Sequence, residues 1–270
     1  WIVESLLWAG EHLHLNLHLF VLTRSARSIL ASIPQWENHS ALELLEGDVL
    51  SWQPKTLLGI THIIHGANYT NSGSQDWALR HMDTALLGLR HVLDIAVVEK
   101  CRNILLLSSG AVYRLRTGKE MPPFCEHEKG ADDYLQEPNV YAVCKYATEM
   151  YAAAFGREHG IRIPVARLFT FFGQHMPQHR RQALSSFVQD ARAGKDIVIA
   201  GDGKAVRSYM HAADMVICCL AILVHGRHGT PYNVGSEQPV SIRDLAEMVS
   251  AASGKGLPVH ILGQAAGGNA

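Results

Sequence analysis

Short apolar runs alternate with longer stretches of helical period along the first part of the chain. The runs of strand length are Leu19–Thr23, Leu42–Leu45, His62–Gly66, Ile104–Ser108 and Ile163–Ala166. The stretches of helical period lie near Trp1–Ala9, Asp76–Glu99 and Tyr141–His159. This alternation predicts a doubly wound α/β fold, a parallel sheet with helices on both faces, because right-handed crossovers place each helix over the sheet.

After Arg167 the pattern changes to glycine-containing and polar loops that separate shorter elements. In this part we expect a helix at Gln182–Gly194, a turn at Gly201–Gly203, a helix at Ala212–Val224 and a strand at Pro258–Leu262. No internal repeat is visible in the sequence. The change of character predicts a second, smaller structural unit.

The composition is that of an ordinary globular protein: 47% of the 270 residues are hydrophobic, 18% are charged, and the formal net charge is −1. A chain of this length can bury a full core in one large domain or two small ones. No run of Lys and Arg is present, so we expect no nucleic-acid partner. The apolar stretches are too short to span a bilayer and the amphipathic start lacks a basic leader, so we expect neither membrane insertion nor a signal peptide.

The cysteines and histidines raise the question of a metal site. The five cysteines, Cys101, Cys125, Cys144, Cys218 and Cys219, have no paired ligand spacing, and their odd number favours reduced thiols in a cytoplasmic protein. His12, His14 and His18 alternate with leucines, so we expect a strand whose solvated face carries the histidines. A zinc site needs three or four converging ligands, and no cysteine or carboxylate cluster joins them. We therefore expect no metal.

The residues that carry candidate chemistry are Ser109, Tyr141 and Lys145. Tyr141 and Lys145 are one helical turn apart on the same face, so the lysine charge can favour the phenolate form of the tyrosine. Ser109 ends an apolar run, where its hydroxyl can hold a substrate oxygen while the phenolate takes the proton. This set suits the conversion of an alcohol to a ketone by hydride loss. The Tyr-x-x-x-Lys spacing alone is weak evidence, because a solvated helix face produces it by chance.

Small or polar residues follow three of the predicted strands. They are Gly47-Asp48-Val49, His65-Gly66-Ala67 and Ser108-Ser109. Ligands of open α/β sheets bind at the carboxyl ends of the strands, so these segments predict one crevice. The alternative for Gly66 and Ala67 is that they are small only for packing.

Five segments in order resemble the extended short-chain dehydrogenases/reductases that act on nucleotide sugars, the NAD-dependent epimerase/dehydratase family. They are Asn103–Tyr113, Tyr141–Lys145, Arg167–Gly173, Gly201–Asp214 and Tyr232–Ser236. The resemblance implies a Rossmann-like dinucleotide-binding domain at 1–168, to which 209–228 returns, and a substrate-binding lobe at 169–208 and 229–270. It also implies a nucleotide-diphosphate sugar as substrate and a homodimer formed through the two long helices.

The resemblance implies a role for each matching residue. Tyr141 is the acid/base, Lys145 lowers its pKa and holds the nicotinamide ribose, and Ser109 rather than Ser108 binds the reacting oxygen. The coenzyme contacts are Asp48, Val49, Gly66, Ala67, Tyr141 and Lys145. Thr170 and Arg207 are the substrate contacts, with a surface arginine in a hairpin as the alternative for Arg207. Asn233 and Asp214 are expected to be structural, and Arg167 suits either purpose.

We expect coenzyme choice to depend on the end of the strand at Val21–Arg27, which corresponds to the family's second strand. A carboxylate there binds the ribose of NAD, whereas Arg24, supported by Arg27, can pair with the extra phosphate of NADP. We therefore expect NAD or NADP, with a slight preference for NADP. The family's first strand and glycine-rich turn are not found before Trp1, and the sequence stops soon after Pro258–Leu262 where the family continues. We therefore expect a chain truncated at both ends, with weak coenzyme binding.

The reaction type is indicated by the residues after Ser109. Dehydratases of the family carry acidic residues there, because eliminating water needs an additional acid and base, and its decarboxylases keep a glutamate. Gly110 and Ala111 instead favour a 4-epimerase, with a 4-keto-sugar reductase using NADPH as the alternative. A dehydratase is less favoured, and the intact Ser109, Tyr141 and Lys145 argue against a non-enzymatic relative. Thr170 and Gln174 depart from the family's usual asparagine and proline.

Overall fold

The computed structural model describes residues 1–69, 76–113, 123–128, 140–174, 176 and 182–263. Within these residues the chain divides into two compact units. The first unit comprises Trp1–Leu168 and Ala213–Val234, and the second comprises Phe169–Ala212 and Gly235–Ala270. The prediction put the return segment at 209–228 and 229–270 in the lobe, whereas the observed return begins at Ala213 and continues to Val234. The reason is that the strand ending there pairs with a strand of the first unit.

The first unit contains a four-stranded parallel sheet of order β10-β5-β4-β3. Its strands are β3 (His62–His65), β4 (Asn103–Ser109), β5 (Val165–Leu168) and β10 (Pro231–Val234). A further parallel pair, β1 (Leu19–Thr23) and β2 (Leu42–Glu46), forms a separate ladder. Among the described residues no backbone ladder joins β1 to β3, so the parallel strands belong to two ladders rather than the single sheet expected.

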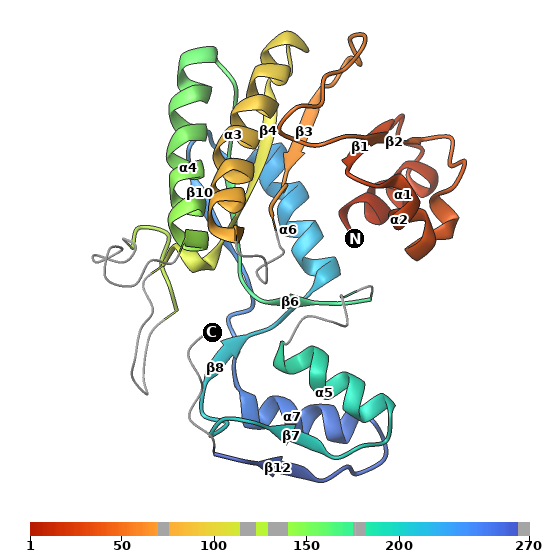
Figure 1. Cartoon of the computed structure of the whole chain (residues 1–270), viewed down its shortest axis with the longest axis vertical. Helices are drawn as coiled ribbons and strands as arrows, with labels where there is room; N and C mark the ends of the chain where they lie inside the picture. The colour runs from red at the N-terminus through yellow and green to blue at the C-terminus, as the bar shows by residue number, and fades with distance from the viewer. Residues whose placement is uncertain (70–75, 114–122, 129–139, 175, 177–181, 264–270) are drawn as a thin grey trace. The chain divides into compact units, whose positions relative to one another are not determined.

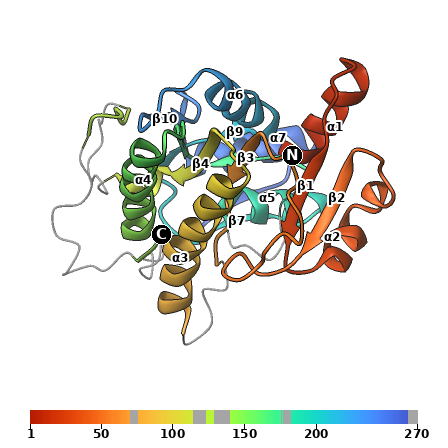
Figure 2. The ribbon, with the colours of Figure 1, turned by 90° about the horizontal axis from the view of Figure 1, so that it is seen from above.

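Two long helices cover one face of the four-stranded sheet and a third covers the other (Figure 2). α3 (Trp77–Val98) and α4 (Val140–His159) lie side by side (Figure 1), and α6 (Ala212–His225) lies on the opposite face. The core beneath α3 and α4 is apolar and contains the fully buried Leu89, Leu93, Ile104 and Ile163. Burial of such side chains is the main stabilising term of the unit.

The start of the chain differs from the strand expected at His12–His18. Helix α1 (Ile2–His12) continues to His12, and His14 lies in the following turn with φ of 53°. Two short helical elements, α2 (Ala26–Ser32) and η1 (Pro34–Trp36), then connect β1 to β2. The strand prediction for these histidines was wrong, because leucine alternation over a few residues does not distinguish a strand from a helix end and a loop.

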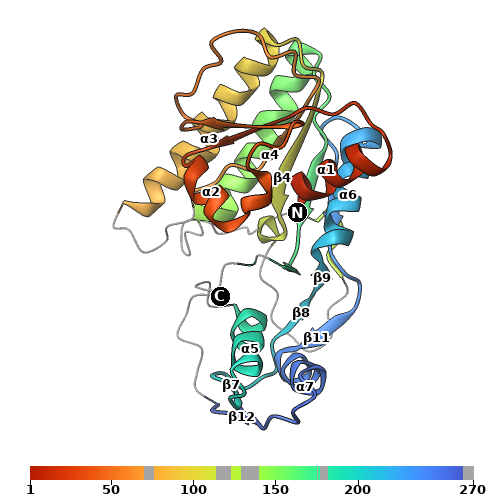
Figure 3. The ribbon, with the colours of Figure 1, turned by 90° about the vertical axis from the view of Figure 1, so that its right-hand side faces the viewer.

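The second unit is built from short elements around a small core (Figure 3). Its helices are α5 (Ala183–Arg192) and α7 (Ile242–Ala252), and its strands are β6 (Phe171–Phe172), β7 (Ile197–Ile199), β8 (Val206–Ser208), β9 (Met210–His211), β11 (Pro239–Ser241) and β12 (Val259–Ile261). Helices α5 and α7 pack with β7, and the core includes Phe187, Ile197, Ile199 and Leu245. The predicted helix at Gln182–Gly194, helix at Ala212–Val224 and strand at Pro258–Leu262 are confirmed within two residues.

No helix within the described residues is both long and apolar enough to cross a membrane. All five cysteines are free thiols. In the described part of the chain, no three His, Cys, Asp or Glu side chains gather as a metal site would require.

Candidate functional site

The carboxyl ends of the four parallel strands lie at one edge of the sheet. The register pairs His65 of β3 with Leu106 of β4, and Ser109 of β4 with Leu168 of β5. In parallel α/β sheets this edge is where ligands bind. The chemistry predicted for Ser109 is therefore at the expected edge.

Ser109 ends β4 and begins a short 3-10 turn, η2 (Gly110–Val112). Its Oγ accepts a hydrogen bond from the backbone N–H of Ala111 at 3.2 Å. The side chain is partly exposed, and its hydroxyl hydrogen remains available to donate. The residue can thus cap the turn and bind a ligand oxygen at the same time.

Tyr141 and Lys145 lie in the first two turns of α4, which packs on β4. The Lys145 Nζ donates a hydrogen bond to the carbonyl of Leu107 at 2.9 Å and lies 5.9 Å from the centroid of the Tyr141 ring. Leu107 is two residues before Ser109 on the same strand, so the structure brings the lysine to the strand end and to the tyrosine ring. No hydrogen bond joins Tyr141 to Ser109.

Burial shifts the protonation of two bases at this edge. The pKa of Lys145 is lowered to about 8, chiefly by burial, while the nearby Glu149 carboxylate and, to a smaller extent, Cys144 oppose the shift. The pKa of His65 is lowered to about 4, by burial first and by the Lys145 charge second. His65 is therefore neutral near pH 7, whereas Lys145 is mostly positively charged there.

Arg167, which the sequence left open between substrate binding and a structural role, is structural. It is 5% exposed and its Nη2 donates to the Glu149 carboxylate at 2.7 Å, while its Nε lies 3.1 and 3.2 Å from the two carboxylate oxygens. The Ser108 hydroxyl also donates to this carboxylate. A buried carboxylate needs a paired charge and hydrogen-bond donors. The Arg167 guanidinium therefore serves Glu149 in the interior and is not available to a ligand.

The same guanidinium connects β5 to β10 through Tyr113. Arg167 Nη1 donates to the Tyr113 hydroxyl at 2.8 Å, and that hydroxyl donates to the Asn233 Oδ1 at 2.6 Å. Asn233 in turn donates two hydrogen bonds. Its backbone N–H donates to the Glu126 carboxylate at 2.9 Å, and its side-chain Nδ2 donates to the Phe124 carbonyl at 2.9 Å. Asn233 thus braces the late strand, in agreement with the structural role expected for it.

The sequence did not identify Glu149 or Tyr113 as partners in this network. Glu149 is one helical turn after Lys145 on the same face of α4, so its spacing was a usable signal. Tyr113 had no such signal, because its partner Asn233 is far along the chain. These contacts depend on the sheet order, which local patterns do not contain.

The predicted coenzyme contacts lie at the ends of three strands. Asp48 is exposed and its carboxylate accepts the backbone N–H of Leu50 at 2.9 Å. Val49 packs on α3 at Gly88, where an added Cβ would lie 3.0 Å from a Val49 methyl. Arg24 is exposed just after β1.

Gly66 and its neighbours after β3 suit a bound dinucleotide. An added Cβ at Gly66 would lie 2.9 Å from a Leu107 methyl, so the packing explanation for a small residue has support. Gly66 is nevertheless exposed on its other side, and Ala67 is partly exposed. The buried Oδ1 of the nearby Asn68 has no hydrogen-bond partner within the part of the chain that the structure describes. A strand end with little side-chain volume and an unpaired acceptor fits a polar ligand with donor groups.

Thr170 and Arg207 belong to the second unit. The carbonyl of Thr170 accepts the backbone N–H of Met210 at 3.1 Å. Arg207 is an exposed residue of β8 whose Nη1 donates to the carbonyl of Val206 at 2.9 Å. Substrate binding by these two residues stays a prediction.

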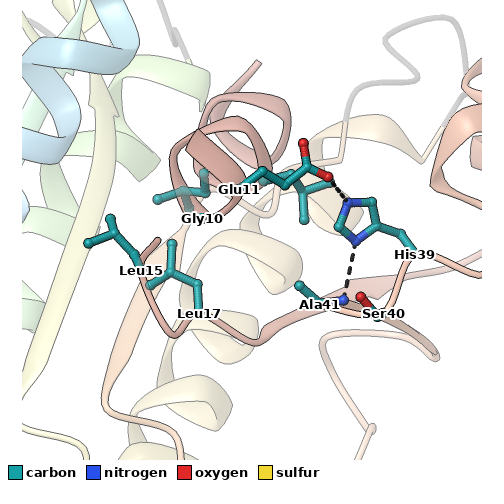
Figure 4. Close-up of a pocket in the computed structure, with 9 residues that line it drawn as sticks. Gly10, Glu11, Leu15, Leu17, His39, Ser40 and Ala41 are labelled. Carbon is teal, nitrogen blue, oxygen red and sulfur yellow. Dashed lines mark hydrogen bonds and ion pairs between the residues drawn. The ribbon is translucent and has the colours of Figure 1, made fainter. Parts of the chain in front are cut away.

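A pocket of about 180 Å³ lies in the first unit between α1 and the start of β2 (Figure 4). Its lining residues are Leu6, Leu7, Gly10, Glu11, Leu15, Leu17, His39, Ser40 and Ala41. His39 is held by the Glu11 carboxylate at 3.2 Å and by the Ala41 N–H at 3.2 Å, as Figure 4 shows. The pocket is at the amino ends of β1 and β2, away from the carboxyl ends that bind ligands in this architecture.

The family model for the NAD dependent epimerase/dehydratase family matches residues 19–235. The chain belongs to this family. The match spans both parallel ladders and the whole edge that carries Ser109, Tyr141 and Lys145.

Curated relatives from the family include decarboxylases. The UDP-glucuronic acid decarboxylase 1 of Xenopus tropicalis is 24% identical over 235 residues, which are 87% of this chain and 54% of the relative. The UDP-N-acetyl-alpha-D-glucosaminuronate decarboxylase of Bacillus cytotoxicus is 27% identical over 170 residues, which are 62% of this chain and 50% of the relative. The chain thus spans about half the length of these curated relatives.

Solved structures of epimerases share the fold. The UDP-glucuronic acid 4-epimerase of Bacillus cereus, in complex with NAD, superposes with a TM-score of 0.79 at 20% identity and covers 97% of this chain and 83% of its own. The UDP-glucose 4-epimerase of Thermotoga maritima, with UDP-glucose, gives a TM-score of 0.77 at 18% identity and covers 96% and 80%. These likenesses show the Rossmann-like fold.

Proposed function

We propose that the protein is a nucleotide-sugar 4-epimerase that uses NAD or NADP. The observation that carries the proposal is the position of the Lys145 amine, which binds the Leu107 carbonyl at the end of β4 and lies over the Tyr141 ring. A tyrosine beside a lysine near a strand end can exchange a proton with an alcohol during hydride transfer. Ser109 ends the same strand and supplies a hydroxyl for the reacting oxygen.

Tyr141 removes the proton from the sugar hydroxyl as the carbinol carbon becomes a ketone, and returns it when the alcohol forms again with the opposite configuration. Ser109 donates a hydrogen bond to the same oxygen throughout, which holds the ketone in place. Lys145 holds its positive charge near the Tyr141 ring, with its amine 5.9 Å from the ring centroid. A nicotinamide coenzyme, when bound, would supply the hydride acceptor for the carbinol carbon and the hydride donor for the ketone.

The coenzyme is proposed to bind the first unit at Asp48, Val49, Gly66, Ala67, Tyr141 and Lys145. The Asn68 acceptor, unpaired among the described residues, and the exposed backbone at Gly66 support this placement. Arg24, exposed after β1, favours NADP over NAD because a guanidinium pairs with a ribose phosphate. Titration of the protein and of Arg24→Asp with both coenzymes tests the preference, and an unchanged affinity ratio would contradict it.

The second unit is proposed to hold the nucleotide sugar through Thr170 and Arg207. Arg207 is exposed and presents guanidinium donors that suit a diphosphate. Loss of a charge-assisted hydrogen bond in Arg207→Ala should raise KM for a UDP-sugar about tenfold or more. Lys204→Ala is the matched control, because Lys204 is an exposed cation of the same segment and is expected to leave KM unchanged. Equal effects of both variants would indicate only a general loss of positive charge.

A coenzyme balance and product analysis separate the reactions open to this family. The protein is incubated with UDP-, dTDP- and GDP-sugars and either coenzyme, and products are identified by mass and NMR. A 4-epimerase yields an isomer of unchanged mass with no net change in reduced nicotinamide. Loss of water or of carbon dioxide would overturn the proposal in favour of a dehydratase or a decarboxylase, although Gly110 and Ala111 provide no acid or base for either.

A reductase of 4-keto sugars is the second candidate, and Arg24 is the observation that favours it. Net consumption of NADPH with a 4-keto sugar would identify this activity. In both reactions Tyr141→Phe should abolish turnover, because the ring remains and the ionisable oxygen is lost.

Pairing of two copies through α3 and α4 is also proposed. These helices carry exposed apolar side chains, among them Leu79 at 69%, Leu87 at 60% and Met150 at 62% exposure. Contiguous exposed apolar surface marks protein contacts, and the proposal requires these side chains to form one such surface. Light scattering after gel filtration tests the pairing: the wild-type protein should be a dimer and Leu87→Glu a monomer.

A further inference from the structure

His81 presents a buried, unused hydrogen-bond acceptor beside the proposed acid/base tyrosine. It lies near the start of α3, is 1% exposed, and its ring centroid is 5.4 Å from that of Tyr141, with the planes tilted by 51°. Trp77, one turn earlier, stacks with the same imidazole at a centroid distance of 5.2 Å. The imidazole therefore contacts two aromatic rings, one of which belongs to the proposed site.

The protonation pattern of this imidazole follows from its neighbours. The His81 Nδ1 is 3.0 Å from the carbonyl oxygen of Tyr69. A carbonyl oxygen can only accept, so Nδ1 carries the hydrogen and donates it. In the neutral ring the other nitrogen, Nε2, then has a bare lone pair. That nitrogen is buried and has no hydrogen-bond partner among the described residues.

An unused acceptor in this place needs an explanation. Most buried polar side-chain atoms in native proteins have a partner, and a buried group left unpaired costs about 1–3 kcal/mol. The ring cannot turn to pair Nε2 without losing the Tyr69 bond. The complement of a fixed, bare lone pair is an O–H donor, and sugars carry several.

We propose that His81 is a substrate-positioning residue whose Nε2 accepts a hydrogen bond from a hydroxyl of the nucleotide sugar, and from a water molecule when no sugar is present. This inference rests on the proposed function. The contact would orient the sugar relative to the phenol of Tyr141, so that the hydroxyl to be oxidised faces the base. It would also favour sugars with a free hydroxyl at the contacted carbon over deoxy or acetylated forms.

Imidazole nitrogen NMR of the protein labelled with ¹⁵N-histidine tests the contact directly. We expect His81 as the Nδ1–H tautomer, with an Nε2 signal that shifts on addition of a UDP-sugar but not on addition of UDP. His91 on the same helix is the internal control: its Nε2 donates to the Trp52 carbonyl at 2.6 Å, so it should show the other tautomer and no response to the sugar. Response to UDP and UDP-sugar alike would point to the nucleotide and overturn the sugar contact.

Variants provide a second measurement. His81→Phe keeps the aromatic packing and removes both nitrogens, and we expect KM for the sugar to rise about three- to tenfold, as for one lost hydrogen bond, with affinity for UDP unchanged. His81→Gln places an amide oxygen at the same reach and should restore part of the affinity. His91→Phe should leave KM unchanged.

The outcomes separate this inference from the proposed function. If the wild-type protein converts a nucleotide sugar while the His81 Nε2 signal stays unchanged, the positioning role is refuted and the function stands. If no nucleotide sugar is bound or converted, the proposed function fails and the sugar contact fails with it. The wild-type spectrum decides the matter even if His81→Phe does not fold.

Discussion

Replacing Arg167 by methionine tests the view that this arginine is a structural partner of Glu149. The two side chains form a buried pair in which the guanidinium contacts both carboxylate oxygens, with Glu149 8% and Arg167 5% exposed. Arg167→Met removes the charge and keeps much of the apolar volume. Glu149 then retains only the Ser108 hydroxyl among the donors that the structure provides to its carboxylate.

The expected loss of stability is large. Removing one partner of a buried ion pair costs about 3–5 kcal/mol, because the remaining charge is uncompensated. For a unit of this size each kcal/mol lowers Tm by about 2–4 °C, so a fall of roughly 6–20 °C is expected. Neutralising the carboxylate as well, in Arg167→Met with Glu149→Gln, should recover at least half of the loss, since the glutamine still accepts from Ser108.

Urea unfolding followed by circular dichroism measures these differences. Arg162→Met is the matched control, because Arg162 is half-buried and donates to the Leu223 and Gly226 carbonyls and to Asn103, with no carboxylate among these acceptors. The loss of unfolding free energy in Arg162→Met should be smaller, about 1–3 kcal/mol, and Glu149→Gln should not change it. The reasoning is refuted if Arg167→Met costs less than about 1 kcal/mol, or if the second substitution rescues nothing.

Three further outcomes are expected. Between pH 6.5 and 4 the folded protein binds fewer protons at His65 than the unfolded chain, so the free energy of unfolding should decrease by about 3 kcal/mol as pH falls through this range; His65→Asn should flatten this decrease in urea titrations, whereas the exposed His62→Asn should not. Turnover should fall as pH rises through about 8, where Lys145 loses its charge, and a Lys145→Arg enzyme that lost activity at the same pH would contradict this assignment. Gly156→Ala should reduce Tm, because the added Cβ would lie 2.6 Å from the Ile161 carbonyl oxygen, and an unchanged melting curve would show that the helix shifts freely.

Much of the first unit could be predicted from the sequence because its elements have strong periods. β1 has the predicted bounds, and α3 and α4 begin and end within one residue of prediction. The alternating leucines and histidines before β1 led to a wrong strand, because the α1 helix and a turn at His14 use the same residues. The pairing of β10 with β5, which extends the return segment, depends on contacts between distant residues that local periods do not encode.

The candidate site also contains residues whose positions the sequence could predict and residues whose roles it could not. Tyr141 and Lys145 share one helix face, so their spacing alone predicted that they lie together. The role of Arg167 could not be predicted, because its partner is on a different element and the choice between a ligand and a carboxylate depends on burial. His81 had no signal in the sequence, since its meaning comes from an unpaired atom and from a ring that packs on it.

The late pairing of β10 has a consequence for how the protein is made. The first unit leaves off at Leu168 and is completed only when Ala213–Val234 has been synthesised. During synthesis, the first unit therefore cannot complete its fold until α6, β10 and Asn233 have been made. The Oδ1 of Asn233 accepts the hydrogen bond from the Tyr113 hydroxyl. A fragment that stops at Leu168 would emerge with one sheet edge uncovered and prone to self-association, so the two units cannot be separated by a single cut.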